Sequence, residues 1–90
     1  MKIKVKAFGD LSTQLGDLKI VEIKDNSTIE VLLSKLAIMT RSYKKGYLGD
    51  YQVGLDLAVL INGKNAETLE DPKILKDGDV VDLIPFTVGG

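Results

Sequence analysis

Hydrophobic and polar residues alternate without interruption at the start of the chain, over residues 2–8 (KIKVKAF). Ile3, Val5 and Ala7 fall on one face of an extended segment, and three lysines fall on the other. This pattern predicts a strand with one buried side and one side open to water. Phe8 continues the alternation on the lysine side.

The pattern changes twice before residue 27. Residues 9–17 are rich in turn-forming residues, but Leu11 and Leu15 stand four apart, which indicates one helical turn. A second strand is predicted over residues 18–24 (LKIVEIK), because Asp25 and Asn26 then interrupt the apolar pattern.

A helix is predicted over residues 28–39. Ser27 and Glu30 have the spacing of a capping box, in which each side chain satisfies a backbone N–H at the helix start. An apolar stripe with helical spacing follows, made of Ile29, Leu32, Leu33 and Leu36. One such helix covers one face of a small sheet, so we expect it on the Ile3, Val5 and Ala7 side.

The second half predicts a loop and three further strands. Residues 40–56 contain three glycines and all three tyrosines and predict a long loop, with the tyrosines forming a small cluster beneath it. The strand 57–61 ends at Asn62-Gly63, a strong signal for a two-residue hairpin to a short strand at 64–66. The last strand, VVDLIP, follows a turn at KDGD. Pro85 cannot donate a hydrogen bond, so regular pairing should lapse there. We expect the last strand beside the first and parallel to it.

Composition removes several classes of function. The 90 residues include neither cysteine nor histidine, which excludes the usual metal ligands and the usual general base and thiol nucleophile. We therefore expect no metal site and no catalytic residue; the Asp77-Gly78-Asp79 sequence predicts a turn, because the remaining ligands of a calcium loop are missing. With a net charge of −1 and scattered lysines, nucleic acid is not an expected partner. The sequence shows neither a signal peptide nor a run of apolar residues able to span a bilayer, so we expect a cytoplasmic protein without a membrane partner.

The order of elements, the turn LKDGDVV and the ending IPFTVGG resemble the MoaD/ThiS family of ubiquitin-like β-grasp sulfur carriers. This family includes the small subunit of molybdopterin synthase and small archaeal modifier proteins. The ending carries the resemblance through Leu83, Ile84, Pro85, Gly89 and Gly90. The implied fold is α+β: a ubiquitin-like β-grasp with a mixed sheet packed on one main helix, with a domain over residues 1–84 and a flexible tail over 85–90. The length of the 40–56 segment favours the molybdopterin or modifier branches, although Phe86 stands where the molybdopterin branch typically has a second proline.

The resemblance also implies a chemistry for the tail. A ubiquitin-activating-like adenylating enzyme would use ATP to adenylate the Gly90 carboxylate, and sulfur would then displace AMP to give a thiocarboxylate. The protein is a substrate in this scheme, with no bound cofactor. Its tail, Pro85, Phe86, Val88 and Gly89, would thread a narrow channel in the partner, with Phe86 and Val88 as apolar anchors. The seven residues from Ile84 onward could reach about 20 Å when extended.

Partner and acceptor remain open at this point. We expect the activating enzyme to hold the body of the domain near Phe8 and Lys6, because an exposed aromatic residue beside a sheet is a common interface anchor, although a solvated strand face also explains the lysines. The sulfur acceptor would be a molybdopterin synthase large subunit or another biosynthetic enzyme. A ubiquitin-like modifier joined through Gly90 to lysines, and an interaction module that is never activated, are the alternatives.

Overall fold

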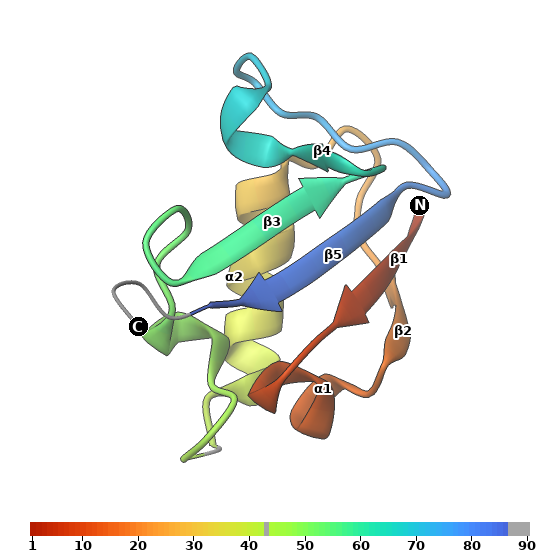
Figure 1. Ribbon diagram of the computed structural model, residues 1–90. Helices are drawn as coiled ribbons and strands as arrows, with labels where there is room; N and C mark the ends of the chain where they lie inside the picture. The colour runs from red at the N-terminus through yellow and green to blue at the C-terminus, as the bar shows by residue number, and fades with distance from the viewer. Residues whose placement is uncertain (43, 87–90) are drawn as a thin grey trace.

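The computed structural model describes residues 1–42 and 44–86, and in this part of the chain the elements follow the order that the sequence predicts (Figure 1). Two α-helices and five strands form the framework, and two short 3-10 helices lie in the connections. The elements are β1 (Lys2–Ala7), α1 (Asp10–Leu15), β2 (Leu18–Glu22), α2 (Ile29–Thr40), η1 (Leu48–Asp50), β3 (Leu57–Ile61), β4 (Lys64–Asn65), η2 (Ala66–Thr68) and β5 (Val80–Pro85).

The strands form one mixed sheet in the order β2-β1-β5-β3-β4. β1 and β5 are parallel, with Val5 opposite Val81 and Ala7 opposite Leu83, while β1–β2, β3–β5 and β3–β4 are antiparallel. The prediction that the last strand lies beside the first and parallel to it is therefore confirmed. As a consequence, the end of β5 occupies the centre of the sheet, between strands on both sides.

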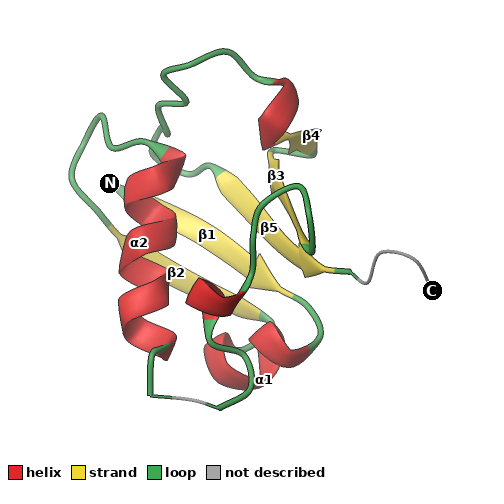
Figure 2. Cartoon of the chain, turned by 90° about the vertical axis from the view of Figure 1, so that its left-hand side faces the viewer, coloured by secondary structure: helices red, strands yellow, loops and turns green. Residues whose placement is uncertain are grey.

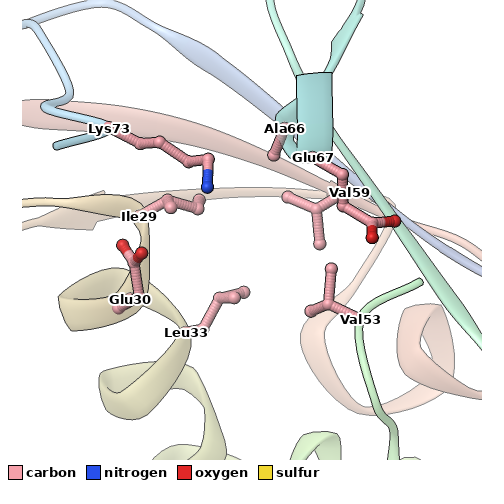
Figure 3. A pocket seen from close by; sticks show the side chains of 8 residues that line it. All are labelled: Ile29, Glu30, Leu33, Val53, Val59, Ala66, Glu67 and Lys73. Atoms are coloured by element: carbon pink, nitrogen blue, oxygen red, sulfur yellow. The ribbon is translucent and has the colours of Figure 1, made fainter. Parts of the chain in front are cut away.

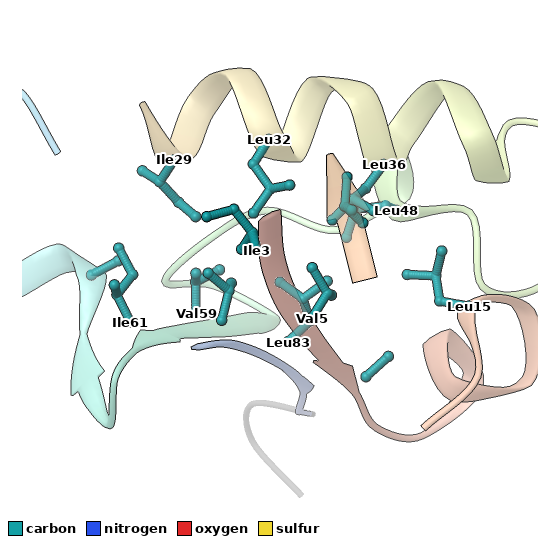
Figure 4. Close-up of a cluster of buried hydrophobic side chains, with 14 of the residues drawn as sticks. Ile3, Val5, Leu15, Ile29, Leu32, Leu36, Leu48, Val59, Ile61 and Leu83 are labelled. Atoms are coloured by element: carbon teal, nitrogen blue, oxygen red, sulfur yellow. The ribbon is translucent and has the colours of Figure 1, made fainter. Parts of the chain in front are cut away.

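Helix α2 covers one face of this sheet and closes the core (Figure 2). Ile3 and Val5 from β1 and Leu32 and Leu36 from α2 are all fully buried (Figure 4). Burial of each such side chain contributes about 1.5–3 kcal/mol relative to leaving it in water. The predicted placement of the helix on the Ile3 and Val5 side is confirmed, and the expected ubiquitin-like β-grasp architecture is the observed one.

The start of α2 differs from the predicted capping box. Thr28 is the N-cap, and its Oγ1 accepts a hydrogen bond of 3.4 Å from the N–H of Val31, whereas the Ser27 hydroxyl donates to the Lys24 carbonyl. The reason is tertiary. The Leu75 N–H donates to the Ser27 carbonyl, which fixes Ser27 in an extended segment before the helix.

Smaller differences concern the ends of strands. β2 ends at Glu22 and not at residue 24, although Ile23 still exchanges backbone hydrogen bonds with Met1. β4 stops at Asn65, where η2 begins. The predicted hairpin at Asn62-Gly63 is confirmed, since both residues have positive φ (51° and 83°) as a type I′ turn requires.

The 40–56 segment connects α2 to β3 without a long helix or strand of its own, as predicted. Leu48 in η1 is buried in the core, Tyr51 packs against that core, and Tyr47 is half-buried. Tyr43, the third member of the predicted cluster, lies outside the described residues. Burial raises the pKa of the Tyr51 phenol above its ordinary value of 10.0, and the negative charges of Asp10, Asp56 and Asp50 act in the same direction.

Thr40 fastens this segment to the end of α2. Its hydroxyl is fully buried, donates to the Leu36 carbonyl at 3.0 Å and accepts the N–H of Leu48 at 3.0 Å. Thr40→Val keeps the side-chain shape but leaves a buried N–H without an acceptor, so we expect a loss of about 1–3 kcal/mol in the free energy of unfolding. Urea denaturation measures this loss. Thr40→Ser retains the hydroxyl and is the matched control; equal losses in both variants would contradict the assigned role of the hydroxyl.

Candidate functional site

The site begins where β5 ends, because the predicted tail leaves the sheet there. On one side the N–H of Phe8 donates to the Leu83 carbonyl at 3.1 Å, and on the other the N–H of Phe86 donates to the Asp56 carbonyl at 3.0 Å. Pro85 between them has no N–H to donate, and β5 ends at this residue as the sequence predicts. The hydrogen bond of Phe86 was not predicted. It holds the backbone in place for one residue beyond the proline.

Gly9 brings the end of β1 against the same point. Its φ is +59°, a conformation that L-residues with side chains rarely adopt. A methyl group at Gly9 would lie 3.4 Å from Cγ of Pro85, which is an ordinary contact distance. The backbone conformation therefore accounts for the glycine, and the turn it makes places the backbone after Phe8 beside Pro85.

The face of the sheet away from α2 carries the predicted partner surface. Phe8 is 45% exposed and Phe86 is 39% exposed, and Lys6 is also exposed. A shallow depression of about 440 Å³ adjoins this surface, lined by Lys6, Ala7, Phe8, Gly9, Ser12, Asp17 and Leu18. The predicted exposure of Phe8 and Lys6 is confirmed. Both residues lie beside the last residues of β5, on its β1 side. We call this side of the sheet the outer face.

The structure adds Asp82 and Ile84 to the outer face. In the register of the sheet, Asp82 lies between Lys6 on β1 and Leu60 on β3, and Ile84 lies opposite Ala58. Oδ1 of Asp82 is buried and has no hydrogen-bond partner within residues 1–42 and 44–86. The alternation in VVDLIP placed both residues on one face, but only the strand order shows that this face is shared with Lys6.

Three of the predicted tail residues, Val88, Gly89 and Gly90, lie outside the described residues. The structure describes Pro85 as the last residue of β5 and Phe86 as the residue that follows it. The expected boundary between residues 84 and 85 thus falls one residue before the end of this strand.

A separate cavity lies on the helix side of the sheet (Figure 3). It has a volume of about 300 Å³ and is lined by Ile29, Glu30, Leu33, Val53, Val59, Ala66, Glu67 and Lys73. A hydrogen bond of 3.0 Å to Asp71 raises the pKa of Lys73 above its ordinary value. Since Ile29 and Leu33 belong to α2, this cavity does not adjoin the outer face.

Two further observations concern the described part of the chain. Among residues 1–42 and 44–86, no group of three acidic residues is arranged to hold a metal ion. Neither α-helix in this part has the length and apolar character needed to cross a membrane.

Comparison with known structures finds the same fold over nearly the whole chain. SAMP1 from Haloferax volcanii superposes with a TM-score of 0.71 at 23% identity, over 100% of both chains. The small archaeal modifier protein 1 from Methanosarcina acetivorans gives 0.63 at 29% identity, over 99% of this chain and 96% of that one. A structure of the complex of subunits 1 and 2 of molybdopterin-converting factor from Helicobacter pylori gives 0.55 at 21% identity, over 100% of both chains.

The sequence comparison gives the family. No curated protein matches the sequence, but the model of the ThiS family matches residues 5–90. This match includes all five strands from the middle of β1 onward, both helices and the end of the chain. The protein therefore belongs to the ThiS family, and its fold is the ubiquitin-like β-grasp of sulfur carriers and small protein modifiers.

Proposed function

We propose that this protein is a sulfur carrier whose Gly90 carboxylate is adenylated and then converted to a thiocarboxylate, with molybdopterin synthesis as the pathway that it supplies. The observation that carries the proposal is the arrangement at the end of β5. The chain leaves from the centre of the sheet, is held by hydrogen bonds from both neighbouring segments, and is flanked by the exposed rings of Phe8 and Phe86. A partner that holds the outer face receives the tail from a fixed starting point.

In this proposal the partner enzyme catalyses both the adenylation of Gly90 and the transfer of sulfur to it. A chain-terminal carboxylate has a pKa of about 3.5 and is ionised and unreactive toward nucleophiles at neutral pH. Its oxygen attacks the α-phosphorus of ATP, diphosphate leaves, and an acyl-adenylate forms. Sulfide then attacks the acyl carbon and AMP leaves, which yields the thiocarboxylate directly. The absence of histidine and cysteine from the sequence agrees with this role as a substrate.

The H. pylori structure supports a large-subunit partner as the sulfur acceptor. That structure is a complex of subunits 1 and 2 of molybdopterin-converting factor, and the present chain shares its fold over the full length. We propose that the outer face docks on an equivalent subunit and that Phe86, Val88 and Gly89 enter its channel. The same face docks on the adenylating enzyme, because both partners have to receive the same tail.

A second candidate function is a protein modifier joined through Gly90 to lysine amines. The similarity to SAMP1 from two archaea favours it. Both functions begin with the adenylate, and they differ in the nucleophile that displaces AMP. Lysine-linked conjugates in extracts of cells that express an epitope-tagged protein would identify the modifier, whereas a terminal thiocarboxylate identifies the carrier.

The test is mass spectrometry of the protein incubated with the adenylating enzyme of its own organism, ATP and a sulfide donor. We expect an acyl-adenylate without sulfide, and the exchange of one terminal oxygen for sulfur when sulfide is present. Neither product should appear without ATP. A protein that forms neither product would be an interaction module, and the carrier function would be wrong.

Replacing Phe8 tests the docking surface. Because an aromatic anchor contributes more than 1 kcal/mol to many interfaces, Phe8→Ala should lower kcat/KM for adenylation by about tenfold. Ile38→Ala, which removes a 62% exposed side chain from α2 on the other side of the sheet, is the matched control and should not change the rate. Adenylation is measured by ATP–diphosphate exchange. Unchanged kinetics in a folded Phe8→Ala protein would exclude this surface.

A further inference from the structure

The edge of the sheet formed by β2, residues Leu18–Glu22, has backbone groups that no neighbouring strand uses. Within residues 1–42 and 44–86, β2 pairs only with β1, on one side. Ile23 exchanges two backbone hydrogen bonds with Met1, and the Ala7 N–H donates to the Asp17 carbonyl. The backbone N–H and C=O groups of the odd-numbered residues along this segment therefore point toward β1. Hydrogen bonding alternates along an antiparallel strand, and the N–H and C=O groups of Leu18 and Ile20 therefore point away from the sheet.

Two large apolar side chains accompany this open edge. Leu18 is 57% exposed and Ile20 is 51% exposed, and both lie on the outer face because they pair with Lys6 and Lys4. Natural proteins usually protect sheet edges with charges, bulges or proline, because an exposed apolar edge pairs with other strands. Here the two positions with free backbone groups carry apolar side chains, which is typical of a surface that another strand covers.

Lysines surround these two positions. Lys4 and Lys6 lie across from Ile20 and Leu18 on the outer face, while Lys19 points toward the helix side. Lys35 reaches from α2 to the edge, where its Nζ donates to the Glu22 carbonyl at 2.7 Å. None of the four forms an ion pair with another side chain in the part of the chain that the structure describes. The acidic residues nearest these lysines are Asp17, which precedes β2, Glu22 at its end, and Asp82, which lies opposite Lys6 on β5.

We propose that the β2 edge binds an extended segment of a partner protein in which apolar and acidic residues alternate. The segment adds a strand to the sheet through the backbone groups of Leu18 and Ile20. Its apolar residues lie beside these two side chains on the outer face, and its acidic residues lie on the opposite side, facing Lys19 and Lys35. The alternation follows from the period of two in a strand, and the acidic character follows from charge complementarity with the lysines.

A second copy of this chain fits the same edge poorly in the two antiparallel registers that place both Leu18 and Ile20 opposite residues of β2. An antiparallel pairing of two β2 strands with Leu18 opposite Ile20 brings Lys19 opposite Lys19, and like charges in direct opposition destabilise a strand pair. Shifting this register by two residues places Leu18 opposite Glu22, which leaves a charged side chain against an apolar one. Both self-pairings also bring two lysine-rich edges together. The partner that the charges favour is therefore acidic.

The experiment titrates the ¹⁵N-labelled protein with two synthetic peptides. One alternates valine and glutamate and the other alternates valine and lysine. We expect the acidic peptide to shift the amide resonances of Leu18 and Ile20 and to protect both amides from hydrogen exchange, and the basic peptide to do neither. Two N-methylated forms of the acidic peptide add a further test, one methylated at every valine and the other at every glutamate. Only one of the two forms should lose binding, because only every second N–H of the bound segment faces β2.

Charge reversal gives the variant test. Lys19→Glu should weaken binding of the acidic peptide by about tenfold, whereas Lys44→Glu, the same change at an exposed lysine in the 40–56 segment, should leave it unchanged. Equal binding of both peptides, resonance shifts confined to residues outside β2, or equal effects of the two variants would overturn the proposal. Dimerisation of the protein through β2, seen as concentration-dependent shifts without peptide, would also overturn it. The test does not use the tail, so its outcome is independent of the sulfur-carrier proposal.

Discussion

One alanine added after Gly90 is expected to abolish formation of the acyl-adenylate. The added residue moves the reactive carboxylate by about 3.3–3.6 Å along an extended chain, which is more than an attack on the α-phosphorus tolerates. The body of the domain cannot compensate, because Phe86 is held by the Asp56 carbonyl and Phe8 by the Leu83 carbonyl. The measurement is ATP–diphosphate exchange with the cognate adenylating enzyme, together with mass spectrometry of the product.

Gly89→Val provides a second variant with the original length. A β-branched side chain widens the segment that has to enter the channel and restricts its backbone, so we expect the same loss of adenylation. Both variants should keep the urea midpoint of the parent, because the change lies beyond the last strand. Lys44→Ala, a surface change in the 40–56 segment, is the control and should react like the parent. If the extended protein forms the adenylate at the parent rate, Gly90 is not the reacting residue.

Leu36→Ala is expected to lower the free energy of unfolding by about 2–5 kcal/mol. Leu36 is fully buried between α2 and the sheet, close to Leu48, and its removal leaves a cavity that the strands cannot collapse to fill (Figure 4). A domain of this size has a total stability of only about 5–10 kcal/mol, so a substantial fraction of it would be lost. Urea denaturation followed by circular dichroism measures the change.

The same helix supplies the control for this prediction. Ile38 lies two residues further along α2 and is 62% exposed. Ile38→Ala therefore truncates a side chain of similar size that is mostly exposed to water, and it should change the free energy of unfolding by less than about 0.5 kcal/mol. A loss at Ile38 as large as that at Leu36 would contradict the assignment of the buried face of α2.

The alternation in residues 2–8 and the apolar stripe of α2 are enough to predict which face of the first strand the helix covers. A period of two sorts side chains onto the two faces of a strand, and a period near 3.6 sorts them onto one side of a helix, so the pattern fixes which faces meet. The Asn62-Gly63 hairpin could also be predicted from its own residues, because asparagine and glycine both adopt the positive φ values that the turn requires. The Gly-Gly ending pointed to the family, which the match over residues 5–90 confirms.

Tertiary structure decided the features that depend on segments far apart in the chain. Thr28 caps α2 in place of Ser27 because Leu75 binds the Ser27 carbonyl, and no local pattern contains that contact. Asp82 joins Lys6, and Phe8 flanks the end of β5, because β1 and β5 are neighbours although more than seventy positions separate them. The open hydrogen-bonding groups of Leu18 and Ile20 follow from the place of β2 at the sheet edge. Sequence periodicity assigns a residue to a face, but only the pairing of strands determines which other residues share that face.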